Sequence, residues 1–182
     1  MPKSLANIKE DILAVTRKLL SEYGYEKLNI RTIASRSGIA TGTLYNYYKS
    51  KQEIVEEILR AEWNMMLRRI DQASKADISL LEKLGTIYNE LVFLMNFVHN
   101  IWFEGPSFSD VDDNQIAQIK CCKKVLLKSL TDKVKQLLGK VEREDSEFLA
   151  DVICTLFISY AYRGDVEFKK LSPVIEALLQ PR

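Results

Sequence analysis

Residues 29–54 read NIRTIASRSGIATGTLYNYYKSKQEI, a pattern typical of two short helices joined by a tight turn. Asn29 can cap a first helix over Ile30–Ser37, because its side chain accepts hydrogen bonds from free amides of the opening turn. Gly38 tolerates the positive φ that the turn needs, and a second helix is expected from about Thr41 to Tyr48. Apolar residues of both helices can fix the angle between them: Ile33, Ala34, Ile39 and Leu44. The stretch predicts a helix-turn-helix.

The second helix of this motif presents small and polar side chains, as the major groove of DNA requires. These candidate DNA-binding residues are Thr41, Gly42, Thr43, Tyr45, Asn46 and Tyr47. Asn46 can read adenine or face solvent, and packing into an aromatic cluster is the structural alternative for the tyrosines. The sequence therefore predicts a DNA-reading surface while leaving individual roles open.

Helical periodicity continues outside the motif, and convincing strand alternation is absent. An amphipathic helix is expected from about Ser4 to Tyr23. Ser50 and Glu53 form a capping box that opens a long helix over about 51–74. Further helices are expected near 78–99, 101–108, 114–138, 146–163 and 167–180. The expected fold is all-α: an N-terminal three-helix domain (1–50) and a larger helical domain (51–182), linked by helix 51–74.

Composition and charge narrow the class of protein. The chain has 182 residues, 47% of them hydrophobic, and a net charge of +1. Residues 1–51 hold nine Lys and Arg against four Asp and Glu, which favours a polyanion as partner at this end. No apolar run approaches the length of a membrane span, and no signal peptide is recognised, so the expected location is the cytoplasm. Three cysteines and one histidine indicate neither disulfides nor a metal site, and no cofactor is expected.

Residues 29–54, with Gly24–Leu28 before them, resemble the DNA-binding domain of the TetR family of transcriptional repressors. The Gly-Thr-Leu-Tyr core at 42–45, the Tyr-Lys-Ser-Lys run at 48–51 and the Ile-Ala pair at 33–34 carry the resemblance. Two departures are mild: Asn29 stands where the family often has Thr, and Ala40 where Ser or Thr is common. The resemblance covers roughly residues 5–60.

The resemblance implies roles for particular positions. Arg31 and Thr32 would touch DNA phosphates, Thr41, Gly42 and Thr43 would lie at the groove-facing start of the recognition helix, and Tyr45 and Tyr47 would contact phosphate or base edges. Lys51 would anchor a phosphate. It also implies a homodimer on a palindromic operator, repression as the more usual outcome, and a small-molecule effector that shifts DNA affinity.

The second domain offers a candidate ligand pocket in the strongly apolar segment 88–103. Aromatic walls and a few polar groups would suit an apolar or amphipathic ligand. The candidate pocket residues are Phe93, Asn96, Phe97, His99, Trp102, Phe103 and Phe108. An ordinary hydrophobic core is the alternative for each of them.

A dimer interface is expected on helices 146–163 and 167–180, because two such helices from each subunit make a four-helix bundle. The candidate interface residues are Leu149, Ile153, Leu156, Phe157, Val174, Ile175 and Leu178. Packing of the same faces within one chain is the alternative.

Two rival functions belong to other classes. The first rival is an all-α enzyme with an apolar pocket. The sequence contains no motif for a nucleophile–base pair, a phosphate loop or a metal site, so the chain is predicted not to be an enzyme. A helical adaptor that binds only proteins would show no salt-dependent DNA binding. The sequence thus favours a DNA-binding regulator with an unidentified effector.

Overall fold

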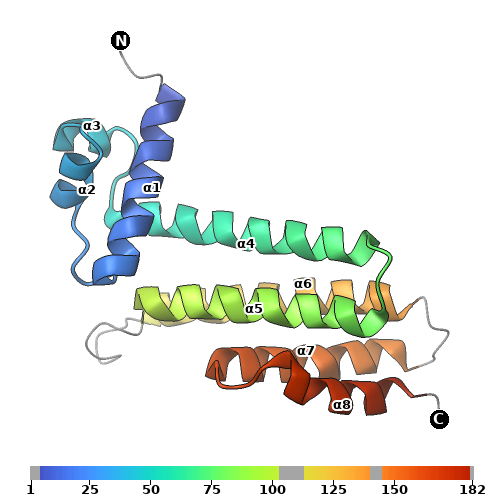
Figure 1. The fold of residues 1–182 in the computed structure, drawn as a ribbon. Coiled ribbons are helices and arrows are strands. Elements are labelled where there is room, and N and C mark those ends of the chain that lie inside the picture. The colour runs from blue at the N-terminus through green and yellow to red at the C-terminus, as the bar shows by residue number, and fades with distance from the viewer. Residues whose placement is uncertain (1–4, 103–112, 140–144, 181–182) are drawn as a thin grey trace. The chain divides into compact units, whose positions relative to one another are not determined.

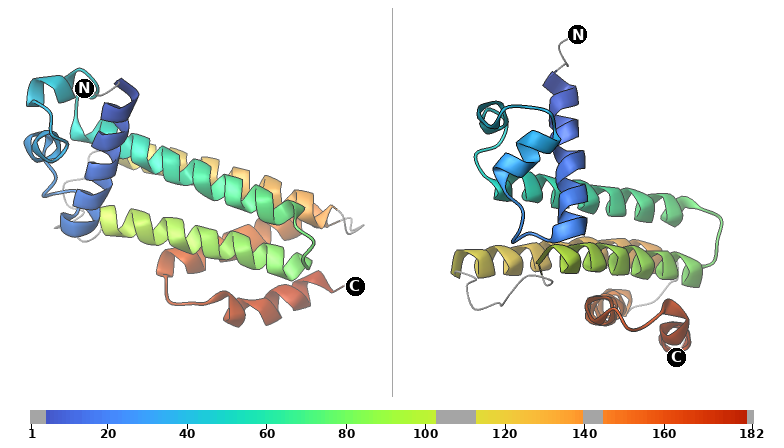
Figure 2. Two further views of the ribbon diagram at one scale, coloured as in Figure 1. Left: turned by 45° about the horizontal axis from the view of Figure 1, so that its top comes forward. Right: turned by 60° about the vertical axis from the view of Figure 1, so that its left-hand side comes forward.

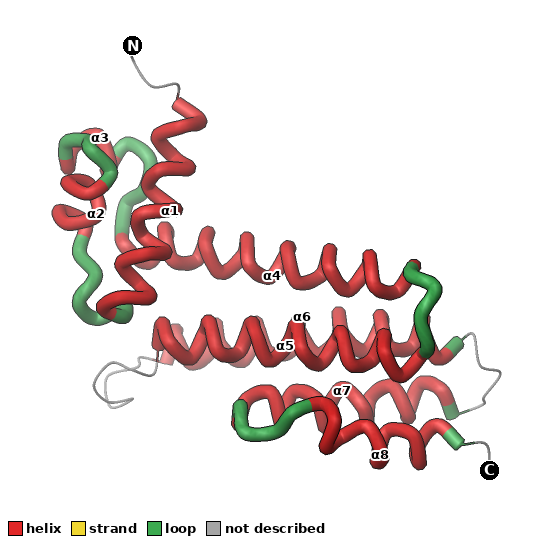
Figure 3. The backbone as a smooth tube through the Cα atoms, viewed as in Figure 1, coloured by secondary structure: helices red, strands yellow, loops and turns green. Residues whose placement is uncertain are grey.

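A computed structural model describes residues 5–102, 113–139 and 145–180 of the chain. Within these ranges the chain forms eight α-helices and no strand, which confirms the all-α prediction (Figures 1 and 3). The helices are α1 (Leu5–Tyr23), α2 (Ile30–Arg36), α3 (Thr41–Tyr45), α4 (Lys51–Lys75), α5 (Leu80–Trp102), α6 (Asp113–Leu138), α7 (Ser146–Arg163) and α8 (Phe168–Leu179).

The described residues divide into two compact units. The first holds residues up to 65 together with 97–102, and the second holds 66–96 and the described residues from 113 onward. Helices α4 and α5 each contribute to both units. The predicted DNA-binding domain (1–50) and ligand-binding domain (51–182) are defined by function and not by packing, so that division stays a prediction.

The first unit packs α1, α2, α3 and the start of α4 around one apolar core. Figure 2 shows α2 and α3 beside α1 in both of its views. Fully buried side chains come from all four helices: Ile12, Leu20, Ile33, Leu44, Ile54 and Ile58. Each falls on the apolar face of its helix, so burial of these faces fixes how the short helices lie against α1.

The second short helix is shorter than predicted. It ends at Tyr45 rather than Tyr48, and the amides that follow donate three residues back, from Asn46 to the Thr43 carbonyl at 3.1 Å and from Tyr47 to the Leu44 carbonyl at 2.9 Å, as in a tighter turn. Only 3% of Tyr48 is exposed, and its hydroxyl donates to Glu57 at 3.0 Å. The Tyr48 ring thus belongs to the core of the first unit.

Helix α5 also differs at both ends from its prediction. It begins at Leu80, after a capping box in which the Glu82 amide donates to Ser79 Oγ at 3.2 Å and the Ser79 amide donates to Glu82 at 2.8 Å. It continues through Trp102, so a separate helix starting at residue 101 is wrong. Residues 103–108 of that predicted helix lie outside the described residues.

In the second unit, an aromatic cluster joins three helices. The Phe157 ring on α7 lies 5.3 Å from that of Tyr88 and 6.1 Å from that of Phe168, between centroids. The Tyr88 hydroxyl donates to the Val166 carbonyl at 2.5 Å. A Cβ on Gly85 would stand 2.9 Å from the Phe168 ring, so a larger residue at this position would force the ring to shift. The cluster holds α5, α7 and α8 together.

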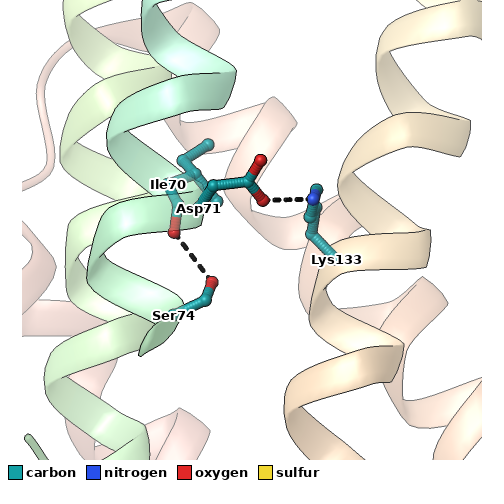
Figure 4. Close-up of polar contacts among 4 residues, drawn as sticks. All are labelled: Ile70, Asp71, Ser74 and Lys133. Carbon is teal, nitrogen blue, oxygen red and sulfur yellow. Dashed lines mark hydrogen bonds and ion pairs between the residues drawn. The ribbon is translucent and has the colours of Figure 1, made fainter. Parts of the chain in front are cut away.

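Ion pairs fix the C-terminal part of α4 within the same unit. Asp71 pairs with Lys133 of α6 (Figure 4). Arg69 Nε lies 2.7 Å from Glu90 of α5. One turn beyond Asp71, Ser74 Oγ donates to the Ile70 carbonyl at 2.7 Å. The two ion pairs attach residues 69–71 to the neighbouring helices, whereas the Ser74 bond lies within α4.

Cys154 is fully buried in the second unit, and burial is the main reason that its thiol pKa is raised to about 12. We expect Cys154 to react with a disulfide reagent at pH 8 far more slowly in the native protein than in urea, because the thiolate is the reactive form. The measurement uses a Cys121→Ser/Cys122→Ser variant, in which Cys154 is the remaining thiol. Equal rates in buffer and in urea would contradict this assignment.

In the part of the chain that the structure describes, no helix is both long and apolar enough to cross a membrane. The same residues contain no group of three or more His, Cys, Asp or Glu side chains arranged to hold a metal ion.

Candidate nucleic-acid interface

The turn between α2 and α3 has the geometry that the sequence predicts. Asn29 lies in an extended conformation and its Oδ1 accepts from the Thr32 amide at 2.8 Å, which confirms it as the cap of α2. Gly38 adopts a φ of 71°. The Ile39 amide then donates to the Ala34 carbonyl at 3.0 Å. A capped α2, a glycine turn and buried Ile33, Ala34 and Leu44 fix the pair of helices.

Replacing Asn29 by alanine is expected to lower the free energy of unfolding by about 1 kcal/mol, because the Thr32 amide loses its acceptor. Urea denaturation of the full chain measures the change. Asn29→Ser is the matched control, since serine also caps helices and should retain most of the stability. Equal losses in both variants would show that the cap is not the cause.

The exposed face of α3 is the candidate reading surface. Tyr45 is 54% exposed, Gly42 and Asn46 are exposed, and Thr41 and Thr43 are half-buried. Leu44, on the opposite face, is completely buried. One face of α3 thus packs on the core through Leu44, and the other presents small and polar groups to solvent. The roles of these groups in DNA binding stay predictions.

Basic residues lie on both sides of α3 in the sequence. Arg31 is exposed at the start of α2, beside half-buried Thr32. Arg36 and Lys49, which the residue-by-residue prediction omitted, are also exposed within the same stretch. The excess of basic residues before position 52 is the signal that could have pointed to them. Lys51 differs, because its ammonium donates to the Tyr25 carbonyl at 3.1 Å.

The end of the motif is joined to α1 and α4 by a partly exposed polar contact. Lys9 Nζ lies 2.9 Å from Glu57, which also accepts from the Tyr48 hydroxyl. Burial, followed by the Glu57 contact, raises the pKa of Tyr48. Tyr47 is half-buried and lies with these groups at a hollow of about 250 Å³, whose wall also includes Glu53, Glu56 and Arg60. Tyr48 therefore stabilises the motif through its contact with Glu57 and is not part of its exposed surface.

The predicted ligand-pocket residues lie in different surroundings. Phe93 is 57% exposed, with the Arg69 guanidinium 5.6 Å above its ring. Asn96 and His99 are exposed, whereas Phe97 packs on the core of the first unit. The side chain of Trp102, and Phe103 and Phe108 entirely, lie outside the described residues. A pocket built from these residues stays a prediction.

The predicted dimer residues separate into two groups. Four are buried within one chain, as the alternative of intrachain packing requires: Leu149, Ile153, Phe157 and Ile175. Leu156 and Leu178 are half-buried, and Val174 is 51% exposed. Phe148, which belongs to the same predicted apolar face, is 74% exposed, and Tyr162, which the prediction missed, is 61% exposed. Periodicity identified apolar faces, but it did not tell which edge of each face stays uncovered.

Known proteins resemble this chain most clearly in its first unit. Residues 12–58 match the family described as "Bacterial regulatory proteins, tetR family". The "HTH-type transcriptional repressor KstR2" of Mycolicibacterium smegmatis is 31% identical over 87 residues, which are 48% of this chain and 42% of that protein. The "Fatty acid metabolism regulator protein" of Bacillus subtilis is 26% identical over 50% of this chain and 46% of its own length. The chain thus spans less than half the length of these relatives.

Solved structures extend the likeness in fold. A transcriptional regulator from Cytophaga hutchinsonii has a TM-score of 0.72 at 16% identity, covering 93% of each chain. The regulator FadR from Bacillus subtilis, solved in complex with stearoyl-CoA, has a TM-score of 0.63 at 19% identity, covering 94% of this chain and 97% of that one. The helix-turn-helix segment of this chain, residues 12–58, thus matches the TetR family of bacterial regulatory proteins, and the fold of the chain is like that of solved transcriptional regulators along nearly its whole length.

Proposed function

We propose that this protein is a sequence-specific DNA-binding regulator that represses transcription as a homodimer and is released from its operator by a small apolar or amphipathic ligand. The exposed polar face of α3, held by a capped and glycine-turned helix-turn-helix, is the observation that carries this proposal. The family consists of regulatory proteins, so the chain is not an enzyme. Its place of action is the cytoplasm, where its DNA is.

DNA binding combines two kinds of contact. Phosphate contacts by cations fix the position of a protein on DNA, and contacts to base edges specify the sequence. Here Arg31, Thr32 and Lys51 would serve the phosphates, whereas Thr43, Tyr45, Asn46 and Tyr47 would approach the bases or their phosphates. Thr41 and Gly42 would allow close approach at the start of α3.

A dimer would give the protein two reading heads. Phe148, Tyr162 and Val174 expose large side chains on α7 and α8, the two helices that the sequence predicts at the contact with a second subunit. A two-fold dimer presents two copies of α3, and its operator would be a palindrome with half-sites about one DNA turn or more apart.

The effector we propose is amphipathic. The related FadR holds stearoyl-CoA, and helix α5 of this chain is apolar over most of its length. A ligand that binds one conformation better would shift the population and lower DNA affinity, typically by about 1–3 kcal/mol. Long-chain acyl-CoA is the first class to test.

The proposal is tested by selecting duplexes from a random-sequence DNA pool with the purified full chain. We expect a palindromic consensus whose affinity falls steeply as salt rises, because phosphate contacts release counterions. Adding stearoyl-CoA is expected to weaken binding to that duplex. Failure to enrich any duplex, or affinity that ignores salt, would favour the protein-binding adaptor. Enrichment without a response to acyl-CoAs would remove only the ligand class.

A further inference from the structure

Lys51 has a different electrostatic setting from the cations of α1. Each of the three described cations of α1 faces a carboxylate: Lys9 pairs with Glu57, Arg17 with Glu62 and Lys18 with Glu22. Lys51, at the first position of α4, has neutral partners instead. Its ammonium lies 3.1 Å from the Tyr25 carbonyl oxygen and 4.2 Å from the centroid of the Tyr25 ring.

This difference matters because a carboxylate cancels the charge of its partner, whereas a carbonyl and a ring face do not. An ammonium has three donors, and the Tyr25 carbonyl takes one of them. The ring attracts the cation through its negative face. Lys51 is therefore held in position with its full positive charge, and among the described residues the Tyr25 carbonyl is the hydrogen-bond acceptor of its ammonium.

The other basic side chains of the motif lack this restraint. Within the described part of the chain, no carboxylate pairs with Lys27, Arg31, Arg36 or Lys49. All four have exposed side chains, which lose rotamer freedom when they bind. Lys51 is half-buried and already oriented, so its contact with an anion costs less ordering.

We propose that Tyr25 is a positioning residue for DNA binding, whose carbonyl and ring hold the Lys51 ammonium for one phosphate of the duplex. This inference rests on the proposed function. It also joins the segment between α1 and α2 to the start of α4, two parts of the chain 26 residues apart. Tyr25 itself packs against the core of the first unit, which fixes the ring that faces Lys51.

A double-mutant cycle tests the inference. The proteins are the wild type, Tyr25→Leu, Lys51→Met and the double variant, each titrated with the selected duplex at several salt concentrations. Leucine keeps apolar packing but removes the ring face. Lys51→Met is expected to reduce the salt slope of log affinity by about one. The affinity lost on Lys51→Met should be about threefold smaller in the Tyr25→Leu background than in the wild type.

Tyr25→Phe is the matched control, because phenylalanine keeps both the ring face and the backbone carbonyl. It should bind DNA like the wild type. Should Tyr25→Leu unfold the domain, as a thermal melt would show, Tyr25→Phe and Tyr25→Trp replace it. Tryptophan holds a cation more strongly than phenylalanine, so Lys51→Met should cost more affinity in the Trp background.

The possible outcomes distinguish failure of the positioning role of Tyr25 from failure of DNA binding itself. If the wild type binds no duplex, both fail. If it binds, but Lys51→Met costs the same affinity in every Tyr25 background, the positioning role fails and DNA binding stands. A fall in melting temperature for Tyr25→Leu with no coupling to Lys51 would make the contact a structural one only, and would also overturn the inference.

Discussion

Phe157→Ala is expected to destabilise the protein by about 3–5 kcal/mol, because it removes a fully buried ring and leaves a cavity between α5, α7 and α8. Tyr88 and Phe168 would each lose an aromatic neighbour. Urea denaturation of the full chain, monitored by circular dichroism, measures the change at one fixed protein concentration.

Phe148→Ala is the matched control on the same helix. Phe148 is 74% exposed, so its loss should leave the subunit's own packing intact, with a change within about 0.5 kcal/mol. If α7 forms the dimer interface, this variant should instead raise the dimer dissociation constant in sedimentation experiments. A Phe157→Ala protein that keeps its stability but loses its partner would place the ring at the interface and contradict the assignment to the core.

Tyr45→Ala is expected to weaken binding to the selected duplex by about ten- to a hundredfold, corresponding to about 1–3 kcal/mol. Tyr45 is 54% exposed on α3, so the loss concerns the DNA contact and leaves the fold unaffected. Fluorescence anisotropy with a labelled duplex gives the affinity, and a thermal melt checks that stability is unchanged.

Tyr23→Ala provides the comparison, because Tyr23 is similarly exposed, at 49%, but lies at the end of α1 outside the motif. Its affinity should stay close to that of the wild type. Tyr45→Phe separates the hydroxyl from the ring: retained affinity would assign the contact to the ring. Wild-type affinity in Tyr45→Ala would remove Tyr45 from the DNA interface.

Much of the fold follows from local sequence rules. Helix α7 spans the predicted residues 146–163, since a polar start, a continuous apolar face and Gly164 in the left-handed region define it within one segment. The Asn29 cap and the Gly38 turn were also predictable, because each depends on contacts within a few residues. The end of α3 was not, because the residues after Tyr45, Asn46 to Tyr48, carry no glycine or proline that would mark a stop.

The helical nature of the protein, the limits of most helices and the helix-turn-helix between Asn29 and Tyr48 follow from local sequence patterns. Periodicity and capping are properties of neighbouring residues, so they can be recognised along the chain. The packing of distant segments, in contrast, makes Phe157 core and Phe148 exposed and places the Lys51 ammonium on the Tyr25 ring. A helical repeat shows which face of a helix is apolar, but the residues that pack against that face can be distant in the sequence. Tyr88 and Val166, which share a hydrogen bond, are 78 residues apart.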